Sequence, residues 1–271
     1  MYLGVTLDWT LSFKAHVQKT KSKVCSRNNI LSKLVGTTWG ASPTTMKATA
    51  LALCYSAAEY ACPVWERSPH AKKMEPALNA SCRLITGCLR PTPANNTYIL
   101  AGIAPPDIRR HVASMRERQR QVEDERHPLF NQTPATNRLK SRVSFLKCVD
   151  PLSTSPKCMR IATWKERLAS LPPATSMALD ASEDLPPGAD TKWIHWKCLN
   201  RLRTGIGRSK VTLNKWGYTD NDDLDCDCGS EPQTMQHLLQ CPLLEQVCSA
   251  DDLATHNDIA RNCVQQWLNT V

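Results

Sequence analysis

Four residues near the C-terminus have types and spacing that suit metal coordination. They are Cys226, Cys228, His237 and Cys241, in the stretch CDCGSEPQTMQHLLQC. Two thiolates on a turn and a His/Cys pair on the following segment can surround one tetrahedral Zn²⁺ ion. The sequence therefore predicts one zinc ion held as in a CCHC knuckle. The alternative is a pair of buried cysteines beside a surface histidine.

A turn followed by a helix would position these ligands. Gly229 permits a turn after the first two cysteines, and Ser230 suits a helix N-cap with Pro232 in the first turn. His237 and Cys241 would then lie one turn apart on the same face of that helix. We expect the helix to end before the proline that follows Cys241.

The spacing between the first two cysteines leaves the ligand set open. Cys226 and Cys228 are separated by one residue, whereas zinc knuckles usually have two or more residues there. Three further candidates lie close downstream and could supply or replace a ligand, namely Cys248, His256 and Cys263.

The elements that must carry this site are predicted to be mainly α-helical. The chain has 271 residues, 41% of them hydrophobic, with 18 prolines and only 6% aromatic residues, which favours a proline-punctuated helical chain over a sandwich of short strands. A short strand is expected over 2–8, where the residues alternate and are β-branched. Helices are expected over the following ranges: 12–34, 43–61, 70–88, 105–126, 158–170 and 190–203, with a last short helix around 259–267.

Composition divides the chain into three parts. Residues 1–126 are expected to form a helical bundle, and residues 190–271 a small helical unit carrying the zinc knuckle. Between them, 127–189 is polar and rich in proline, and is expected to be a linker with one short helix.

No secretory or membrane segment is expected. Residues 1–5 do not resemble a signal peptide, and no stretch approaches 18 uncharged apolar residues. The 13 cysteines are scattered through helix-like segments, which is typical of reduced thiols in an intracellular protein. We therefore expect a nuclear or cytoplasmic protein that is not secreted.

The charge is unevenly distributed. Residues 1–220 hold 33 Lys/Arg and 16 Asp/Glu, a net +17, whereas residues 221–271 hold 1 and 9, a net −8. A basic body of this kind suggests a polyanionic partner, although a merely Lys/Arg-rich solvated surface is the alternative, notably for the arginine row over 109–126. The candidate nucleic-acid contacts are Lys14, Lys21, Arg201, Arg203, Arg208 and Lys210.

No known catalytic constellation stands out in the sequence. Gly-rich phosphate loops, Gly-x-Ser-x-Gly and His-Glu-x-x-His are all absent. Paired acids occur at Asp251 and Asp252, as in polymerases, but their flanks indicate a helix start. Ser249 is therefore predicted to be an N-cap followed by acids in the first turn.

Several short motifs together resemble the C-terminal part of the reverse transcriptase of non-LTR, jockey-like retrotransposons. At the N-terminal end these are YLGVTLD (2–8), LSFKAH (11–16), LALCYS (51–56), PVW (63–65), RLITG (83–87) and RPTP (90–93). Towards the C-terminus they are IAPP (103–106), NRLRTG (200–205), KWG (215–217) and the Cys/His cluster. The resemblance is weakest over 127–190.

The resemblance implies a helical thumb that grips template–primer duplex through its backbone, followed by a CCHC zinc knuckle near element RNA or target DNA. The family's catalytic aspartates belong to a palm that would precede Tyr2, so this chain is not expected to polymerise DNA by itself. The acidic surroundings of the knuckle suggest that it folds and positions the basic loop over 201–208, with RNA contact secondary. The alternatives are an α-helical interaction protein with a purely structural zinc site, or a decayed reading frame without function.

Overall fold

The computed structural model describes residues 1–130, 132, 149–172, 177–219 and 224–271. These residues are mainly helical, which confirms the predicted fold class, and they form no sheet beyond three isolated β-bridges. Contacts group the chain into two compact units. Unit 1 comprises 1–27, 51–78 and 104–171, and unit 2 comprises 28–50, 79–103 and 172–271. The sequence predicted domain boundaries near 126 and 190. A grouping by contacts does not show which segments fold independently, so these boundaries stay a prediction.

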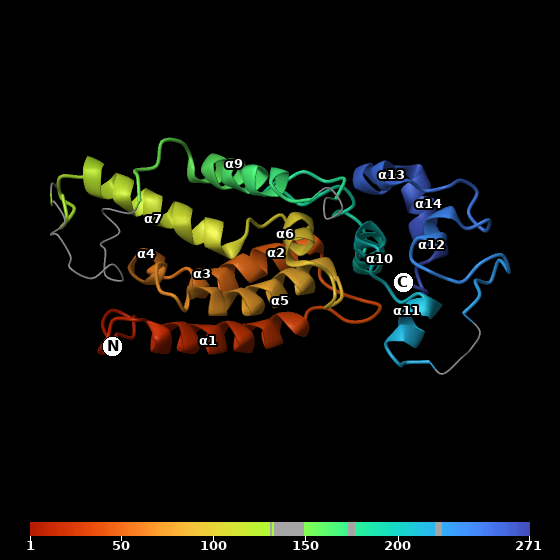
Figure 1. Cartoon of the computed structure of the whole chain (residues 1–271), viewed down its shortest axis with the longest axis horizontal. Helices are drawn as coiled ribbons and strands as arrows, with labels where there is room; N and C mark the ends of the chain where they lie inside the picture. The colour runs from red at the N-terminus through yellow and green to blue at the C-terminus, as the bar shows by residue number, and fades with distance from the viewer. Residues whose placement is uncertain (131, 133–148, 173–176, 220–223) are drawn as a thin grey trace. The chain divides into compact units, whose positions relative to one another are not determined.

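Segments of unit 1 and unit 2 alternate along the chain, and the helices of both are labelled in Figure 1. Two helices cross between the units, α1 (Lys14–Ser32) and α5 (Glu75–Thr86). Unit 1 otherwise holds the π-helix η1 (Leu51–Tyr55), α3 (Ser56–Ala58), α4 (Cys62–Trp65), the 3₁₀-helix η2 (Ala71–Met74), α7 (Pro106–Glu123) and α9 (Pro156–Ala169). Unit 2 otherwise holds α2 (Pro43–Ala50), α6 (Ala94–Ala101), α10 (Trp193–Thr204), α11 (Lys210–Lys215), α12 (His237–Gln240), α13 (Ala250–Thr255) and α14 (Asp258–Gln266).

Most of the predicted helices are present within a few residues of their expected bounds. The predicted helix over 43–61 is divided into α2, η1 and α3 and ends at Ala58, shortly before Ala61, which has a left-handed φ of 49° and precedes α4. The predicted helix over 70–88 begins with a 3₁₀ turn, and only 75–86 is α-helical. Helix α6 was not among the predicted helices; it begins directly after Pro93 and ends at Gly102, which has a left-handed φ of 58°.

The strand expected over 2–8 is replaced by a tight turn. Tyr2 and Val5 exchange backbone hydrogen bonds of 2.8 and 2.9 Å, and Leu3 and Gly4 between them have φ values of 43° and 81°. With no neighbouring strand to pair with among the described residues, the backbone satisfies its polar groups locally. The alternating pattern indicated an extended backbone, but it could not show whether a second strand would be present to pair with it.

Two arginines of the row over 109–126 form ion pairs inside unit 1. The Arg109 Nη2 donates to Glu59 at 3.0 Å, and the Arg110 Nη2 lies 3.4 Å from Glu75. The Arg110 guanidinium also lies 5.9 Å from the ring centre of the buried Trp65. These arginines pack α7 against its neighbours, so the row is not simply a solvated face.

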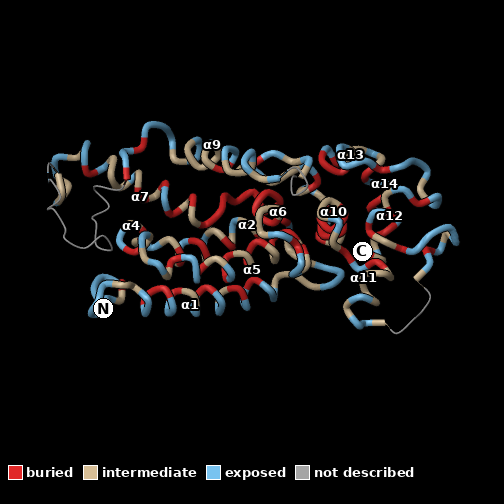
Figure 2. Tube along the Cα trace, viewed as in Figure 1, coloured by how far each residue is buried: buried red, intermediate tan, exposed pale blue. Residues whose placement is uncertain are grey.

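Unit 2 is organised around the buried helix α10. The Trp196 Nε1 donates to the Ile85 carbonyl at 3.0 Å, and the Asn200 side chain donates to the Thr86 carbonyl at 2.9 Å. Lys197 reaches the Thr37 carbonyl at 2.6 Å. Helix α10 is thus hydrogen-bonded to 79–103, while its Cys198, Leu199 and Leu202 belong to the hydrophobic core of the C-terminal helices. Most of its residues are buried (Figure 2). Among the described helices, none has the length and apolar character needed to cross a membrane.

Candidate metal centre

The structure brings together the four residues predicted to bind a metal. The ligand atoms of Cys226, Cys228, His237 and Cys241 all lie within 4.8 Å of one another. Cys226 and Cys241 are buried, with exposed fractions of 3% and 2%, and Cys228 is half-buried. Four soft or borderline donors converging in a mostly buried position could hold a metal ion.

The separations between these atoms fit a tetrahedral ion. The Sγ atoms of Cys226 and Cys241 are 3.7 Å apart, and the Cys228 Sγ is 3.3 Å from the His237 Nε2. Metal–sulfur bonds of about 2.3 Å and metal–nitrogen bonds of about 2.0 Å in a tetrahedron give S–S and S–N edges of about 3.8 and 3.5 Å. Both observed edges come within a few tenths of an ångström of these values. The sulfur separation is also far too long for a disulfide.

A hairpin-like turn presents the first two cysteines. The Cys226 N–H donates to the Glu231 carbonyl at 2.9 Å, and the Gly229 N–H returns to the Cys226 carbonyl at 2.8 Å. Gly229 has a φ of 72°, a conformation that favours glycine. The turn predicted from Gly229 is thus present, and it directs both thiols towards the side on which His237 lies.

The helix after this turn is shorter than predicted. It was expected to start at Ser230 and to carry both His237 and Cys241. Instead α12 begins at His237 and spans only four residues, with Cys241 extended just beyond it. The segment before α12 is engaged elsewhere, because Pro232 forms a bridge with Asp225 and the Ser230 hydroxyl lies 2.9 Å from the Cys228 Sγ.

A carboxylate supports the histidine from outside the cluster. The His237 Nδ1 lies 3.3 Å from a carboxylate oxygen of Glu231, while its Nε2 faces Cys228. A carboxylate beside Nδ1 favours the tautomer that leaves Nε2 free to coordinate, as is common for metal-binding histidines. Glu231 was not among the sequence-predicted residues. Its position midway between the ligand pairs was the only signal that could have identified it.

Local hydrogen bonds and burial shift the pKa values of two thiols in the cluster in opposite directions. A hydrogen bond with the Ser230 side chain, assisted by the Ser230 backbone and His237, lowers the pKa of Cys228 to about 6. Burial, with the neighbouring sulfur atoms, raises the pKa of Cys241 to about 12. Several thiolates packed this closely repel one another, and a bound cation removes that repulsion.

Lys210 ties the turn to the basic loop that precedes α11. Its ammonium donates to the Asp225 carbonyl at 2.7 Å and to the Asp227 carboxylate at 3.0 Å. The Lys210 backbone N–H donates to the Gln233 side chain at 3.1 Å, and Gln233 is only 2% exposed. Lys210, predicted as a nucleic-acid contact, is therefore engaged with the cysteine turn.

The last helix packs against the metal cluster. The Trp267 Nε1 donates to the Leu238 carbonyl at 2.8 Å, and both residues belong to the hydrophobic core that also contains Cys226 and Cys241. The end of α14 is therefore packed against the segment that carries His237. The N-cap predicted at Ser249 is confirmed, as a capping box with Asp252 at the start of α13.

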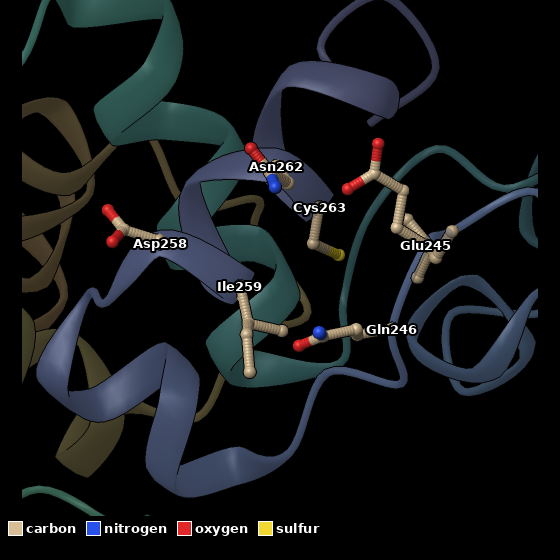
Figure 3. A pocket seen from close by; sticks show the side chains of 7 residues that line it. Glu245, Gln246, Asp258, Ile259, Asn262 and Cys263 are labelled. Atoms are coloured by element: carbon tan, nitrogen blue, oxygen red, sulfur yellow. The ribbon is translucent and has the colours of Figure 1, made fainter.

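The three alternative ligands lie outside the four-donor group. The thiols of Cys248 and Cys263 hydrogen-bond to each other, and His256 ends α13 with a φ of 54°. Cys263 borders a cavity of about 160 Å³ between α14 and the loop that carries Glu245 and Gln246 (Figure 3). The carboxylates at this cavity are solvent-exposed. Among the described residues, only the four predicted ligands gather as a potential metal site.

Arg201 and Arg203 are bound within unit 2. Arg201, 6% exposed, donates its Nε to the Gly87 carbonyl at 3.1 Å and its Nη1 to the Val271 carbonyl. Arg203 donates to the Leu253 carbonyl at 2.9 Å and to other backbone carbonyls nearby. Burial lowers the pKa of each arginine to about 10. Both guanidinium groups hold the fold together, and their predicted contact with nucleic acid stays a prediction.

The remaining basic candidates lie nearer to solvent. Lys14 and Arg208 are exposed, and Lys21 is half-buried. Lys14 and Lys21 both lie on α1 in unit 1, two turns apart on one side of the helix, whereas Arg208 lies in unit 2. The structure therefore does not assemble all six predicted residues into one local cluster.

Comparison with models of protein families, with curated proteins and with solved structures finds no match to this chain.

Proposed function

We propose that the protein binds nucleic acid through the exposed face of α1, and that it corresponds to the thumb and knuckle region of a non-LTR retrotransposon reverse transcriptase. One observation carries the binding part. Over its 19 residues α1 has five Lys/Arg and no Asp or Glu. Because duplex backbones are recognised mainly through their charge, an acid-free basic helix suits template–primer duplex or element RNA.

The exposed face of α1 has the composition of a phosphate-binding surface. Lys14, Lys19 and Lys23 are exposed, and none has a carboxylate partner among the described residues. Between them the face carries small polar side chains, including Gln18 and Ser22. Lysines with interspersed amide and hydroxyl groups are the usual donors to phosphate oxygens.

A charge-reversal experiment tests this assignment. Wild-type protein and the double variant Lys19→Glu/Lys23→Glu are titrated against labelled duplex at 50 to 200 mM salt. We expect wild-type affinity to fall steeply with salt, and the variant to bind at least about 10-fold more weakly with a shallower salt slope. The matched control is Lys72→Glu/Lys73→Glu, which makes the same charge change at two exposed lysines of η2 in unit 1. Equal losses in both variants, or absence of wild-type binding at low salt, would contradict the proposal.

We propose Zn²⁺ as the ion at the metal centre. Three thiolates and one imidazole in a tetrahedral arrangement suit zinc and disfavour Mg²⁺ and Ca²⁺, which prefer oxygen ligands. With four protein ligands the site is closed, so its role is to stabilise unit 2 and to position the basic loop. Elemental analysis by mass spectrometry should find one zinc per chain, lost in Cys226→Ser and retained in Cys25→Ser, an exposed cysteine outside the cluster.

A second candidate function is an α-helical interaction protein whose metal site is purely structural. The burial of Arg201 and the carbonyl contacts of Arg203 favour it, because these side chains serve the fold of unit 2. In that case the α1 charge reversal leaves nucleic-acid binding unchanged, and Cys228→Ala still destabilises unit 2.

A further inference from the structure

Trp9 is almost entirely exposed. The residue has an exposed fraction of 99%, the highest among the large hydrophobic residues described. Most tryptophans in this protein are buried, as is usual for so large an apolar side chain. An indole that contributes nothing to the core is available to a partner outside the described fold.

The turn that presents Trp9 is held in place by several hydrogen bonds. The Asp8 carboxylate accepts from the Ser12 N–H at 2.6 Å, the Ser12 hydroxyl at 2.8 Å and the Lys14 N–H at 3.1 Å. The Ser68 hydroxyl donates to the Ser12 carbonyl from the far side. Trp9 therefore projects from an organised turn at the start of α1, all within unit 1.

A shallow hollow lies between this indole and the first two turns of α1. Its volume is about 450 Å³, and its lining includes Trp9, Lys14, Ala15 and Gln18. The hollow combines one aromatic plane with a cation, an amide and the hydroxyl-bearing residues of the turn.

We propose that Trp9 stacks on an unpaired base of a single-stranded nucleic acid whose backbone continues along the basic face of α1. This inference rests on the proposed function and specifies the strand that the surface recognises. Aromatic side chains beside a positively charged track are how single strands are bound without sequence preference, since every base has a face to stack. Bases inside a duplex are already stacked on each other and cannot cover the indole.

The surroundings of Trp9 favour nucleic acid over a protein partner. Leu7 and Leu11, two residues either side of Trp9, are exposed as well, so apolar surface alone would also suit a protein. The charge of the hollow decides the choice, because Lys14 lines it together with the polar residues Thr10, Ser12 and Gln18. The only acid that lines the hollow is Asp8, and its oxygens are already occupied by the turn. Lys14 and the acid-free helix behind it complement phosphate charge.

The test compares single-stranded and duplex binding in the full-length, metal-loaded protein. Fluorescence anisotropy is measured with a labelled 12-nucleotide oligo(dT) and with a 12-base-pair duplex. Because stacking on an aromatic residue contributes about 1–3 kcal/mol per base, Trp9→Ala should weaken oligo(dT) binding about 5- to 150-fold and leave duplex binding within about 2-fold. Trp9→Phe should retain most of the affinity. Trp39→Ala, at another exposed tryptophan, should behave as wild type.

The outcomes separate this inference from the function on which it rests. If wild type binds and Trp9→Ala binds oligo(dT) equally well, the stacking site is refuted while the α1 surface stands. Equal losses on single strand and duplex also refute it. If Trp9→Ala changes only self-association, measured by light scattering, the surface is a protein contact and the inference fails. If wild type binds neither probe at low salt, the proposed function itself fails.

Discussion

Replacing Arg203 with alanine should destabilise unit 2 and leave nucleic-acid binding largely intact. The Arg203 Nε donates to the Leu253 carbonyl at 2.9 Å, and its Nη2 donates to the Pro187 and Ala254 carbonyls at 2.7 and 3.3 Å. Its guanidinium also lies 6.0 Å from the ring centre of Trp196. One side chain thus links α10 to α13 and to the segment before α10.

The size of the effect follows from these contacts. A hydrogen bond to a charged group contributes about 1.5–3 kcal/mol net, and bonds from one side chain are not additive. The contact with the Pro187 carbonyl is solvent-exposed, so we count only the two hydrogen bonds to the Leu253 and Ala254 carbonyls. Losing both should lower the free energy of unfolding by about 3 kcal/mol. With a urea m-value of about 2–3 kcal/mol/M, the unfolding midpoint should fall by about 1–1.5 M.

Urea unfolding followed by tryptophan fluorescence measures this change. Arg208→Ala is the matched control, since Arg208 is exposed and lies five residues further along the chain, beyond the end of α10. We expect it to change stability by less than about 0.5 kcal/mol. A midpoint unchanged in Arg203→Ala, together with a loss of nucleic-acid affinity, would refute the structural role assigned to this guanidinium.

Three further predictions concern the metal centre and unit 1. Removing the metal with a chelator should lower the thermal midpoint of the protein, and returning zinc should restore it; a midpoint that does not respond would show that the site carries no stabilising ion. Glu231→Gln should weaken metal binding about 10-fold in competition with a chromophoric chelator, because the His237 Nδ1 loses its charged partner; unchanged affinity would contradict that role. Burial raises the pKa of Asp107, but the Arg167 guanidinium at 2.6 and 3.0 Å lowers it more, to a net value below the usual 3.8. A carboxylate with a lowered folded-state pKa stabilises above its unfolded pKa and loses that contribution as pH falls through the folded value. For this partly exposed pair Asp107→Asn should therefore cost about 1 kcal/mol at pH 7. In urea titrations the difference from wild type should shrink as pH falls below about 4 and vanish once the pH lies below the lowered folded-state pKa of Asp107; a difference that does not shrink over this range would contradict the assignment.

The metal centre illustrates how far local sequence reasoning reaches. Which four residues gather was predictable, because three thiols and an imidazole at this spacing are typical of a metal site. The path of the backbone was not, since the predicted helix from Ser230 gave way to a turn paired with Glu231. Capping signals are local, and here a competing bridge between Asp225 and Pro232 removes the residues that the helix needed.

For the basic residues, the tertiary structure decided more than the sequence could predict. Arg203 and Arg208 are alike in sequence context, yet one binds carbonyls inside unit 2 and the other is exposed. A guanidinium offers five donors, and whether it meets protein carbonyls or solvent depends on which segments the fold brings near it. Sequence could identify the charge but not its partner.

Local sequence patterns were enough to predict the helical class, most helix positions and the four Cys/His residues that gather in the fold, because periodicity, caps and ligand spacing act over a few residues. Tertiary structure alone decided the rest. It buried α10 between 79–103 and the C-terminal helices, placed Glu231 behind His237 and left Trp9 in solvent. These features depend on contacts between residues far apart in the chain, or on their absence, and no local pattern encodes them.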